Sequence, residues 1–127
     1  MSYLFDNNFS PRLAEMLALA GIDAKALRAE FPENIPDVDY LPRLKDSGFI
    51  LMTSDRHILT RSAEAIALKQ SGITALFFKS FFIEMELRPQ AAWLLNHWPK
   101  IEEFVKRSHQ GTIGLVPHRG QIRRYPL

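Results

Sequence analysis

The sequence of 127 residues contains no cysteine and only four histidines. The absence of thiols excludes a disulfide framework, a thiolate zinc site and a cysteine nucleophile, and it favours an intracellular protein. The histidines do not have the spacing of metal ligands, and none stands beside a serine and an acid as a hydrolase triad requires. They are His57, His97, His109 and His118.

Several other features are also missing. No glycine-rich phosphate loop is present. No apolar run approaches the length of about 18 residues that a membrane span needs, and the first residues lack the basic and apolar segments of a secretory signal. We therefore expect a cytoplasmic protein without membrane contact. There is no internal repeat, low-complexity segment or dividing linker, so residues 1–127 are predicted to form a single domain.

Charge of neither sign dominates. The chain carries 16 basic and 14 acidic residues, which gives a net charge of +2 and a pI of about 9.1. This balance permits a polyanionic partner without requiring one. Hydrophobic residues make up 46% of the chain, enough to fill the core of one domain.

Strand-like and helix-like patterns alternate along the chain. Ser10 and Pro11 give a typical helix start, with a capping hydroxyl followed by proline at the first helical position. Strands are predicted at 3–5, 22–27, 49–53, 73–78 and 112–117, and helices at 11–20, 37–46 and 62–70, with one or two more over 93–105 divided near Pro99. Such alternation predicts a three-layer α/β/α sandwich around a mostly parallel sheet.

Three aspartates are expected at one edge of this sheet. Asp6 follows the first strand, Asp55 follows the third, and Asp37 begins a helix after the second. The carboxyl ends of parallel strands share an edge, where ligands bind in such folds. Each aspartate also has a structural interpretation. Asp6 could shape a turn, Asp37 could cap a helix, and Asp55 with Arg56 could form a surface turn.

A cluster of carboxylates favours a bound cation. Like charges at close range repel one another, and a cation relieves this repulsion. Oxygen ligands without histidine or cysteine favour Mg²⁺ or Mn²⁺, which often bind carboxylates together with substrate phosphates. The pattern therefore indicates phosphoryl chemistry. A phosphatase-like enzyme with Asp6 as nucleophile is a third possibility, but no second aspartate follows two residues later.

The stretches FDNNFSPRLAEML, IPDVDYLPRL and ILMTSDRHI resemble the PIN-domain superfamily, in particular the VapC-type toxin ribonucleases of bacterial toxin–antitoxin pairs. The resemblance covers about the first 80 residues. It implies a Mg²⁺- or Mn²⁺-dependent endoribonuclease in which Asp6, Asp37 and Asp55 bind the metal, the ion activates water and the water attacks a phosphodiester in line. Asn8 would help to order the site.

Other expectations depend on the same resemblance. PIN nucleases commonly carry a fourth acid, for which Asp39 and Asp46 are the nearest candidates. A cognate antitoxin is implied as partner, and a homodimer is possible through the helix around 93–105, which could instead face the antitoxin or the core. The alternative function is a weakly active or inactive PIN-like module that binds a protein or RNA.

Several basic residues are candidates for contact with RNA phosphates. Arg12 and Arg56 could pair with phosphate oxygens, since the guanidinium group suits them, and Lys79 follows the fourth strand. The end of the chain, VPHRGQIRRYPL, is basic and could also contact an RNA backbone. For all of these side chains, simple solvation is the competing interpretation.

Overall fold

A six-stranded sheet runs through the centre of the protein. The computed structural model describes residues 1–126. The strands follow the order β2-β1-β3-β4-β5-β6; the first five are mutually parallel, and β6 pairs antiparallel with β5. Their bounds are β1 Ser2–Phe5, β2 Ala24–Ala26, β3 Phe49–Thr53, β4 Ala75–Phe78, β5 Ile113–Val116 and β6 Arg123–Arg124.

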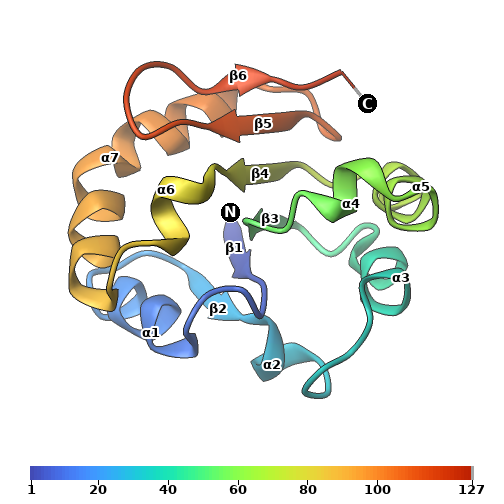
Figure 1. Ribbon diagram of the computed structural model, residues 1–127, viewed down its shortest axis with the longest axis horizontal. Coiled ribbons are helices and arrows are strands. Elements are labelled where there is room, and N and C mark those ends of the chain that lie inside the picture. Colours follow the sequence, from blue (N-terminus) through green and yellow to red (C-terminus); the bar gives the residue numbers. More distant parts are fainter. Residues whose placement is uncertain (127) are drawn as a thin grey trace.

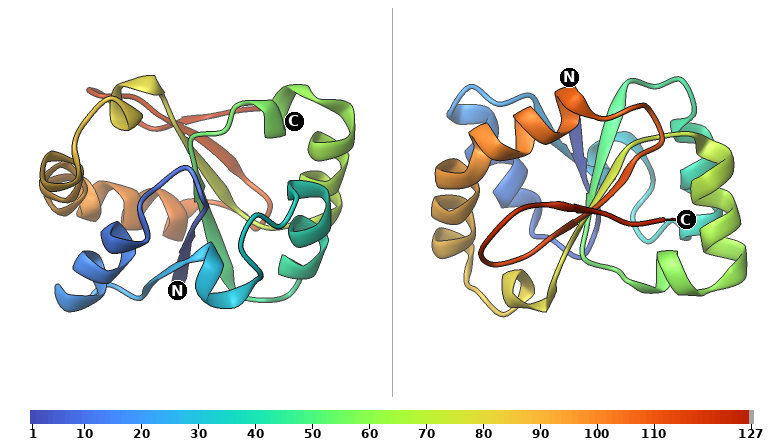
Figure 2. Two further views of the ribbon diagram at one scale, coloured as in Figure 1. Left: turned by 60° about the horizontal axis from the view of Figure 1, so that its bottom comes forward. Right: turned by 90° about the horizontal axis from the view of Figure 1, so that it is seen from above.

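Helices cover both faces of the sheet, as Figures 1 and 2 show. One face carries α1 (Pro11–Leu19), α6 (Ser80–Ile83) and the long α7 (Leu87–Arg107). The other carries α2 (Leu27–Glu30), α3 (Asp37–Tyr40), the 3₁₀ helix η1 (Leu41–Leu44), α4 (His57–Thr60) and α5 (Ser62–Ser71). This is the predicted three-layer α/β/α arrangement.

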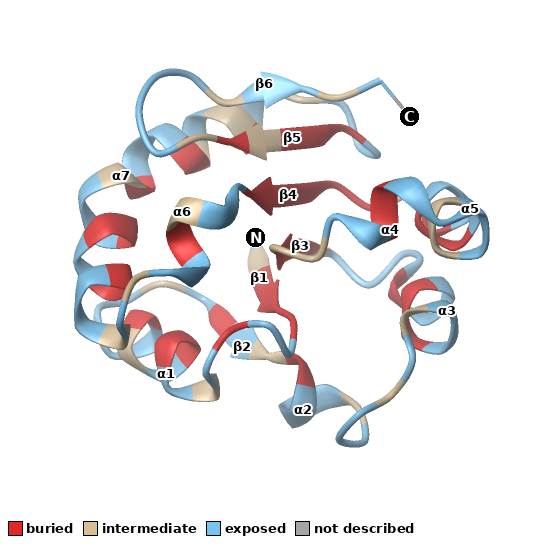
Figure 3. Ribbon diagram, in the orientation of Figure 1, coloured by how far each residue is buried: buried red, intermediate tan, exposed pale blue. Residues whose placement is uncertain are grey.

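The central strands are buried on both faces, which explains their continuous apolar sequences. Side chains alternate along each strand. Tyr3 and Phe5 of β1 pack in the core beneath α1 and α7, whereas Leu4 packs in the core beneath α3 and α5. Figure 3 shows the buried positions concentrated along β3 and β4. Two separate apolar cores therefore lie on opposite sides of the sheet.

Most predicted elements are present at nearly the predicted positions. The helix start at Ser10 is confirmed, because its hydroxyl accepts a hydrogen bond from the backbone N–H of Arg12 at 3.2 Å. The predicted helix over 37–46 is shorter, since α3 passes into a 3₁₀ turn that contains Pro42 and stops before Lys45. Tyr40, Leu41 and Leu44 are buried there.

The C-terminal third differs more from expectation. A single helix, α7, runs through the predicted division at Pro99. Its inward face carries Trp98, Ile101 and Val105 into the core, so packing maintains the helix although proline cannot donate a backbone hydrogen bond. The helix around 93–105 thus faces the core along one side. Within the basic tail, Arg123 and Arg124 form β6 and remain exposed, so pairing with β5 is compatible with their solvation; Leu127 lies outside the described residues.

Candidate active site

Asp6 is the first residue after β1 and is 4% exposed. Its backbone N–H continues the sheet by donating to the Met52 carbonyl at 3.0 Å. Alternation along the strands directs Asp6 and Thr53 to the face covered by α3, α4 and α5. There the Thr53 hydroxyl donates a hydrogen bond to Asp6 Oδ2. A carboxylate is thus held inside the protein at the carboxyl edge of the sheet.

The turn after β1 also binds Asp6. The Asn8 backbone N–H donates to Asp6 Oδ1 at 3.0 Å. With its side-chain nitrogen turned toward the carboxylate, Asn8 also donates to Oδ1 and Oδ2 at 3.3 and 3.2 Å. The turn-forming interpretation of Asp6 is therefore correct for one oxygen, while its burial goes beyond what a turn requires. Asn8 lies where the sequence predicted, beside the acid.

Burial makes the charged form of Asp6 costly. Desolvation raises its pKa to about 7, hydrogen bonds from Thr53 and the Asn8 backbone oppose the shift, and Asp37 and Asp55 raise it further. A carboxyl group with this pKa exchanges its proton near neutral pH. Perturbation by burial together with specific charged neighbours is typical of functional sites.

Asp55 follows β3 and forms a local turn. Its backbone N–H donates to the Thr53 hydroxyl at 3.0 Å. Its Oδ1 accepts from the His57 backbone N–H at 3.0 Å and lies 3.2 Å from His57 Nδ1. The surface-turn interpretation thus also holds for one oxygen of Asp55. Thr53 connects Asp6 with Asp55, since one hydroxyl contacts both residues.

Asp37 is the first residue of α3 and does not cap it. Pro36 occupies the N-cap position, and no side chain caps this helix, so the predicted capping role is wrong. The carboxylate is partly buried. Desolvation raises the pKa of Asp37, the charges of Asp55 and Glu64 raise it further, and the Tyr40 hydroxyl lowers it. Asp37 therefore faces the other acids across the edge of the sheet.

Two buried hydroxyl groups near these acids form no well-aligned hydrogen bond in the described part of the chain, although that of Tyr40 lies close enough to Asp37 to lower the pKa of this acid. They belong to Tyr40 and Ser54. Burial raises the pKa of the Tyr40 phenol, and the charges of Asp6, Asp37 and Asp55 raise it further, so the ring lies among all three carboxylates. Buried polar groups normally have partners, and those without one require an explanation.

Glu64 was missed by the sequence analysis. It lies in the first turn of α5 with a side chain that is 16% exposed, and it acts on Asp37 through its charge. The helices that follow β3 begin at the carboxyl edge of the sheet, so an acid in a first turn there was the available signal. The two suggested candidates fit less well. Asp39 is exposed, and Asp46 precedes β3 and so lies toward the opposite edge.

Arg12 and Arg56 are exposed near this edge, in the first turn of α1 and directly after Asp55. Neither forms an ion pair with another residue in the range 1–126. Their guanidinium groups therefore have no acidic partner that a phosphate would need to displace. The structure brings Asp6, Asn8, Asp37 and Asp55 together and leaves the two arginines at the rim.

The donor set suits a hydrated ion better than a dehydrated one. Among residues 1–126 no three His, Asp or Glu side chains are grouped closely enough to hold a metal directly. Mg²⁺, however, usually keeps several waters and binds through one or two carboxylates. Asp37 and Asp55, which raise one another's electrostatic cost, supply such a pair, with Asp6 beside them. Carboxylate chemistry and charge fit a hydrated Mg²⁺ or Mn²⁺.

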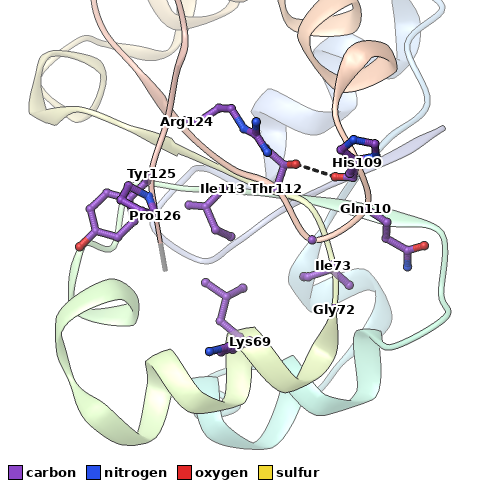
Figure 4. A pocket seen from close by; sticks show the side chains of 12 residues that line it. Lys69, Gly72, Ile73, His109, Gln110, Thr112, Ile113, Arg124, Tyr125 and Pro126 are labelled. Carbon is purple, nitrogen blue, oxygen red and sulfur yellow. Dashed lines mark hydrogen bonds between the residues drawn. The ribbon is translucent and has the colours of Figure 1, made fainter.

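The acids do not line either of two hollows in the described part of the chain. One, of about 520 Å³, lies at the opposite edge, where Gly72, Ile73 and Thr112 precede β4 and β5 (Figure 4). Thr112 closes its wall by donating to the His109 carbonyl at 2.6 Å. The other, of about 750 Å³, lies beside α7.

No described helix is both long and apolar enough to cross a lipid bilayer.

Comparison with curated proteins gave no match, and neither did comparison with solved structures. Comparison with protein families matched residues 1–80 to the PIN like domain, which has a nuclease-type fold. The matched segment contains β1, β3 and all of the acids discussed above. The chain therefore belongs to the PIN-like domain family.

Proposed function

We propose that the protein is a Mg²⁺- or Mn²⁺-dependent endoribonuclease and the toxin of a type II toxin–antitoxin pair of the VapC type. The observation that carries the proposal is the convergence of Asp6, Asp37 and Asp55 on one sheet edge, where burial and mutual repulsion raise the pKa of Asp6 to about 7. A cation at this edge would relieve that repulsion. Membership of a family with a nuclease-type fold supports the same chemistry.

In this proposal Asp37 and Asp55 hold the cation, with Asp6 beside them. When bound, such an ion supplies a Lewis acid for the phosphoryl oxygen and lowers the pKa of water. The protein's own residues do the positioning. Thr53 and Asn8 fix both oxygens of Asp6, so its carboxylate cannot rotate away. Mutation of such outer partners commonly reduces metal affinity or activity by about 10–100-fold.

The exposed arginines have a role in binding. Arg12 and Arg56 are exposed, on segments that follow Asp6 and Asp55, and carry guanidinium groups that suit phosphate oxygens. They would bind the phosphates that flank the scissile bond. Their positive charge would also offset the repulsion between RNA and an edge of carboxylates. The substrate class follows from this combination of acids and flanking cations.

The remaining parts of the proposal come from the resemblance to VapC-type toxins. They include a cytoplasmic location, a cognate antitoxin whose binding would block the acidic edge, and possible homodimerisation. The exposed apolar side chains Leu95 on α7 and Ile66 on α5 are available for such protein contacts, at 46% and 55% exposure.

One observation favours the competing function, a PIN-like module that binds RNA or protein without catalysis. The described acids do not form a direct metal cage, and Thr53 and Asn8 already occupy the oxygens of Asp6. A protonated Asp6 would then be a neutral structural group. The two functions differ in their response to a cation, because a binding module needs none.

A cleavage assay separates the two. Wild-type protein is incubated with RNA in Mn²⁺ and in chelator, beside Asp37→Asn and the matched control Asp39→Asn. Asp39 lies on the same short helix and is exposed. We expect cleavage that needs the cation, is retained by Asp39→Asn and is lost in Asp37→Asn by more than about 100-fold, beyond the range of outer-shell residues. Cleavage of equal rate in chelator, or no cleavage at all, would refute the nuclease.

A further inference from the structure

A groove of about 750 Å³ lies between α7 and the hairpin formed by β5 and β6. We name it the α7 groove. These elements run beside one another at one end of the molecule (Figures 1 and 2). Its lining residues fall between Trp93 and Arg124, so the groove lies wholly outside the segment 1–80 that matches the family. It is a feature of this chain that the family match does not account for.

One face of α7 forms a wall of the groove. Trp93, His97, Lys100, Phe104 and Arg107 line it and recur at steps of four and three, the spacing of a single helical face. Trp93 and Phe104 contribute apolar rings to this stripe, and His97, Lys100 and Arg107 contribute polar or charged groups. This face of α7 therefore presents both aromatic rings and positive charges to the groove.

The charge of the groove is positive. Lys100 and Arg107 contribute from α7 and Arg124 from β6. Glu103 is the one acid among the lining residues, and Arg107 donates to its Oε1 at 3.2 Å. His97 and His109 add two imidazoles. Lys100 and Arg107 are seven positions apart in the C-terminal part of α7, and this separation suits an extended anion better than a compact one.

Flat side chains lie at one end of the groove. The rings of Trp93 and His97 stack with their centroids 4.0 Å apart and their planes at 13°. Beside them Phe81 stacks on the exposed His118 at 4.8 Å and 16°. The Trp93 indole N–H donates to the His118 carbonyl at 3.4 Å, which connects the two stacks. Trp93 itself is buried at 9% exposure, so the rings of this group that reach the surface are the half-buried His97 and the exposed His118. Ring faces at the surface can stack on the bases of a single strand.

The floor of the groove depends on Gly114 in β5. A Cβ at this position would lie 2.8 Å from Phe104 Cε1 and 3.0 Å from Ile122 Cγ2, closer than such contacts occur. Because Gly114 has no side chain, Phe104 of α7 and Ile122 before β6 can pack directly against β5. Phe104 and Ile122 both line the groove. Glycine thus sets how closely the two walls are held.

The groove reaches the edge of the sheet that carries the acids at Pro117, on the face opposite to the one that Asp6 enters. Pro117, a lining residue, follows β5, and parallel strands place its end on the same edge as Asp6. Between β5 and β1 lie β4 and β3, and β4 is followed by the exposed Lys79, whose backbone N–H donates to the Val116 carbonyl at 3.1 Å. Lys79 therefore lies at the edge of the sheet between the end of the groove and the acids.

We propose that the α7 groove binds the backbone of single-stranded RNA and guides it to the acidic edge. The guiding role rests on the proposed function. A single-stranded RNA offers both a charge at each nucleotide and flat bases, which match the spaced cations and the stacked rings. An acidic protein segment matches the cations alone, so RNA is the better occupant.

Binding is measured without cleavage. The probe is a fluorescent single-stranded oligonucleotide with 2′-O-methyl groups, titrated in chelator over a series of KCl concentrations. Lys100→Gln with Arg107→Gln neutralises the groove. Arg88→Gln with Lys106→Gln is the matched control, since both residues are exposed on α7, lie outside the lining and remove the same charge. Circular dichroism verifies that each variant is folded.

The expected result is salt-dependent binding by wild-type protein. Loss of a phosphate contact to single-stranded RNA lowers the slope of log K against log salt by about 0.7, so we expect a decrease of about 1.4 in the groove variant and little change in the control. An equal loss in both variants, or no binding by wild-type protein, overturns the inference. Tighter binding of an oligo-glutamate peptide than of RNA, lost in the same variant, also overturns it.

The cleavage assay described above distinguishes this inference from the proposed function. Asp37→Asn is expected to bind the probe like wild-type protein, because it lies outside the groove. If wild-type protein does not cleave RNA but the groove variant loses binding of the probe, the groove is an RNA site and the proposed nuclease activity is refuted. If wild-type protein cleaves RNA but the groove variant binds the probe as tightly as wild-type protein does, only the groove proposal is refuted.

Discussion

Thr53 donates its hydroxyl hydrogen to Asp6 and at the same time accepts the backbone N–H of Asp55. The two acids follow different strands, β1 and β3, and this one hydroxyl connects them. From the sequence Thr53 is simply the last residue of an apolar run. Its position next to the acids makes it the residue whose removal best tests how the edge is held together.

Thr53→Val is expected to destabilise the protein and weaken the site. Valine has the same shape but leaves a buried oxygen of Asp6 and the N–H of Asp55 without a partner, at a cost of about 1–3 kcal/mol. Urea unfolding measures the loss. Thr60→Val is the control, since Thr60 is exposed and its hydroxyl makes only a 3.4 Å contact with the Arg56 carbonyl. Equal stability of the two variants would contradict the role of Thr53.

The stability of the metal-free protein is expected to decrease as the pH rises from about 4 to about 7. Burial raises the pKa of Asp6 to about 7, above its ordinary value of 3.8, so the folded state binds this proton more tightly than the unfolded state does. The contribution is fully present below the unfolded pKa and is lost as the pH rises through the folded pKa. Chemical unfolding in chelator at a series of pH values measures it.

Asp6→Asn tests the assignment of that titration. Asparagine carries no charge to bury, so the decrease in stability between pH 4 and 7 should largely disappear, and the variant should be at least as stable as wild-type protein at pH 8. The same variant should not cleave RNA. A pH profile that is unchanged in Asp6→Asn would assign the titration to another group.

Divalent cations are expected to stabilise the folded protein at neutral pH. A ligand that binds only the folded state stabilises it by about 2.7 kcal/mol at 100 times its dissociation constant. The melting temperature should therefore rise with Mn²⁺ and reach a plateau in calorimetry. Asp37→Asn should reduce the shift, whereas Asp39→Asn should not. A shift of equal size in both variants would place the cation elsewhere.

Tyr40→Phe is expected to separate stability from activity. The buried Tyr40 hydroxyl forms no well-aligned hydrogen bond but stabilises the charged form of Asp37, so its removal should change the free energy of unfolding by no more than about 1 kcal/mol. If this hydroxyl serves the acids that surround it, cleavage should nevertheless decrease by about 10–100-fold. Unfolding and cleavage are measured on the same preparation. Tyr125→Phe, on the tail beside β5, is the control, and unchanged cleavage in Tyr40→Phe would make its ring purely structural.

The sequence was informative where strand pattern alone determines position. Asp6 and Asp55 could be placed at one edge because each directly follows an apolar run, and parallel strands align such ends. Glu64 and Tyr40 could not be placed in the same way. Their positions depend on how α3 and α5 are rotated against the sheet, and Tyr40 gave only the signal of an inward-facing core residue.

The α7 groove shows a second limit. Its walls come from the stripe on α7 and from a strand of two residues, β6, which is too short to give a periodic signal. The tail was recognised as basic, but its pairing with β5 depends on long-range contacts, including a bond of 2.7 Å from the Tyr125 N–H to the Ile113 carbonyl. Gly114 likewise gave no signal, because its importance is steric.

The contact between Tyr3 and Trp98, whose rings lie 4.7 Å apart edge to face, spans the boundary of the family match. Tyr3 belongs to the strand that delivers Asp6, and Trp98 to the helix that covers it. A fragment ending at residue 80 would contain every acid of the candidate site but would expose Tyr3 to water, because Trp98 would be missing. The matched segment therefore lacks part of the core that supports the site, and we expect it to aggregate when it is expressed alone.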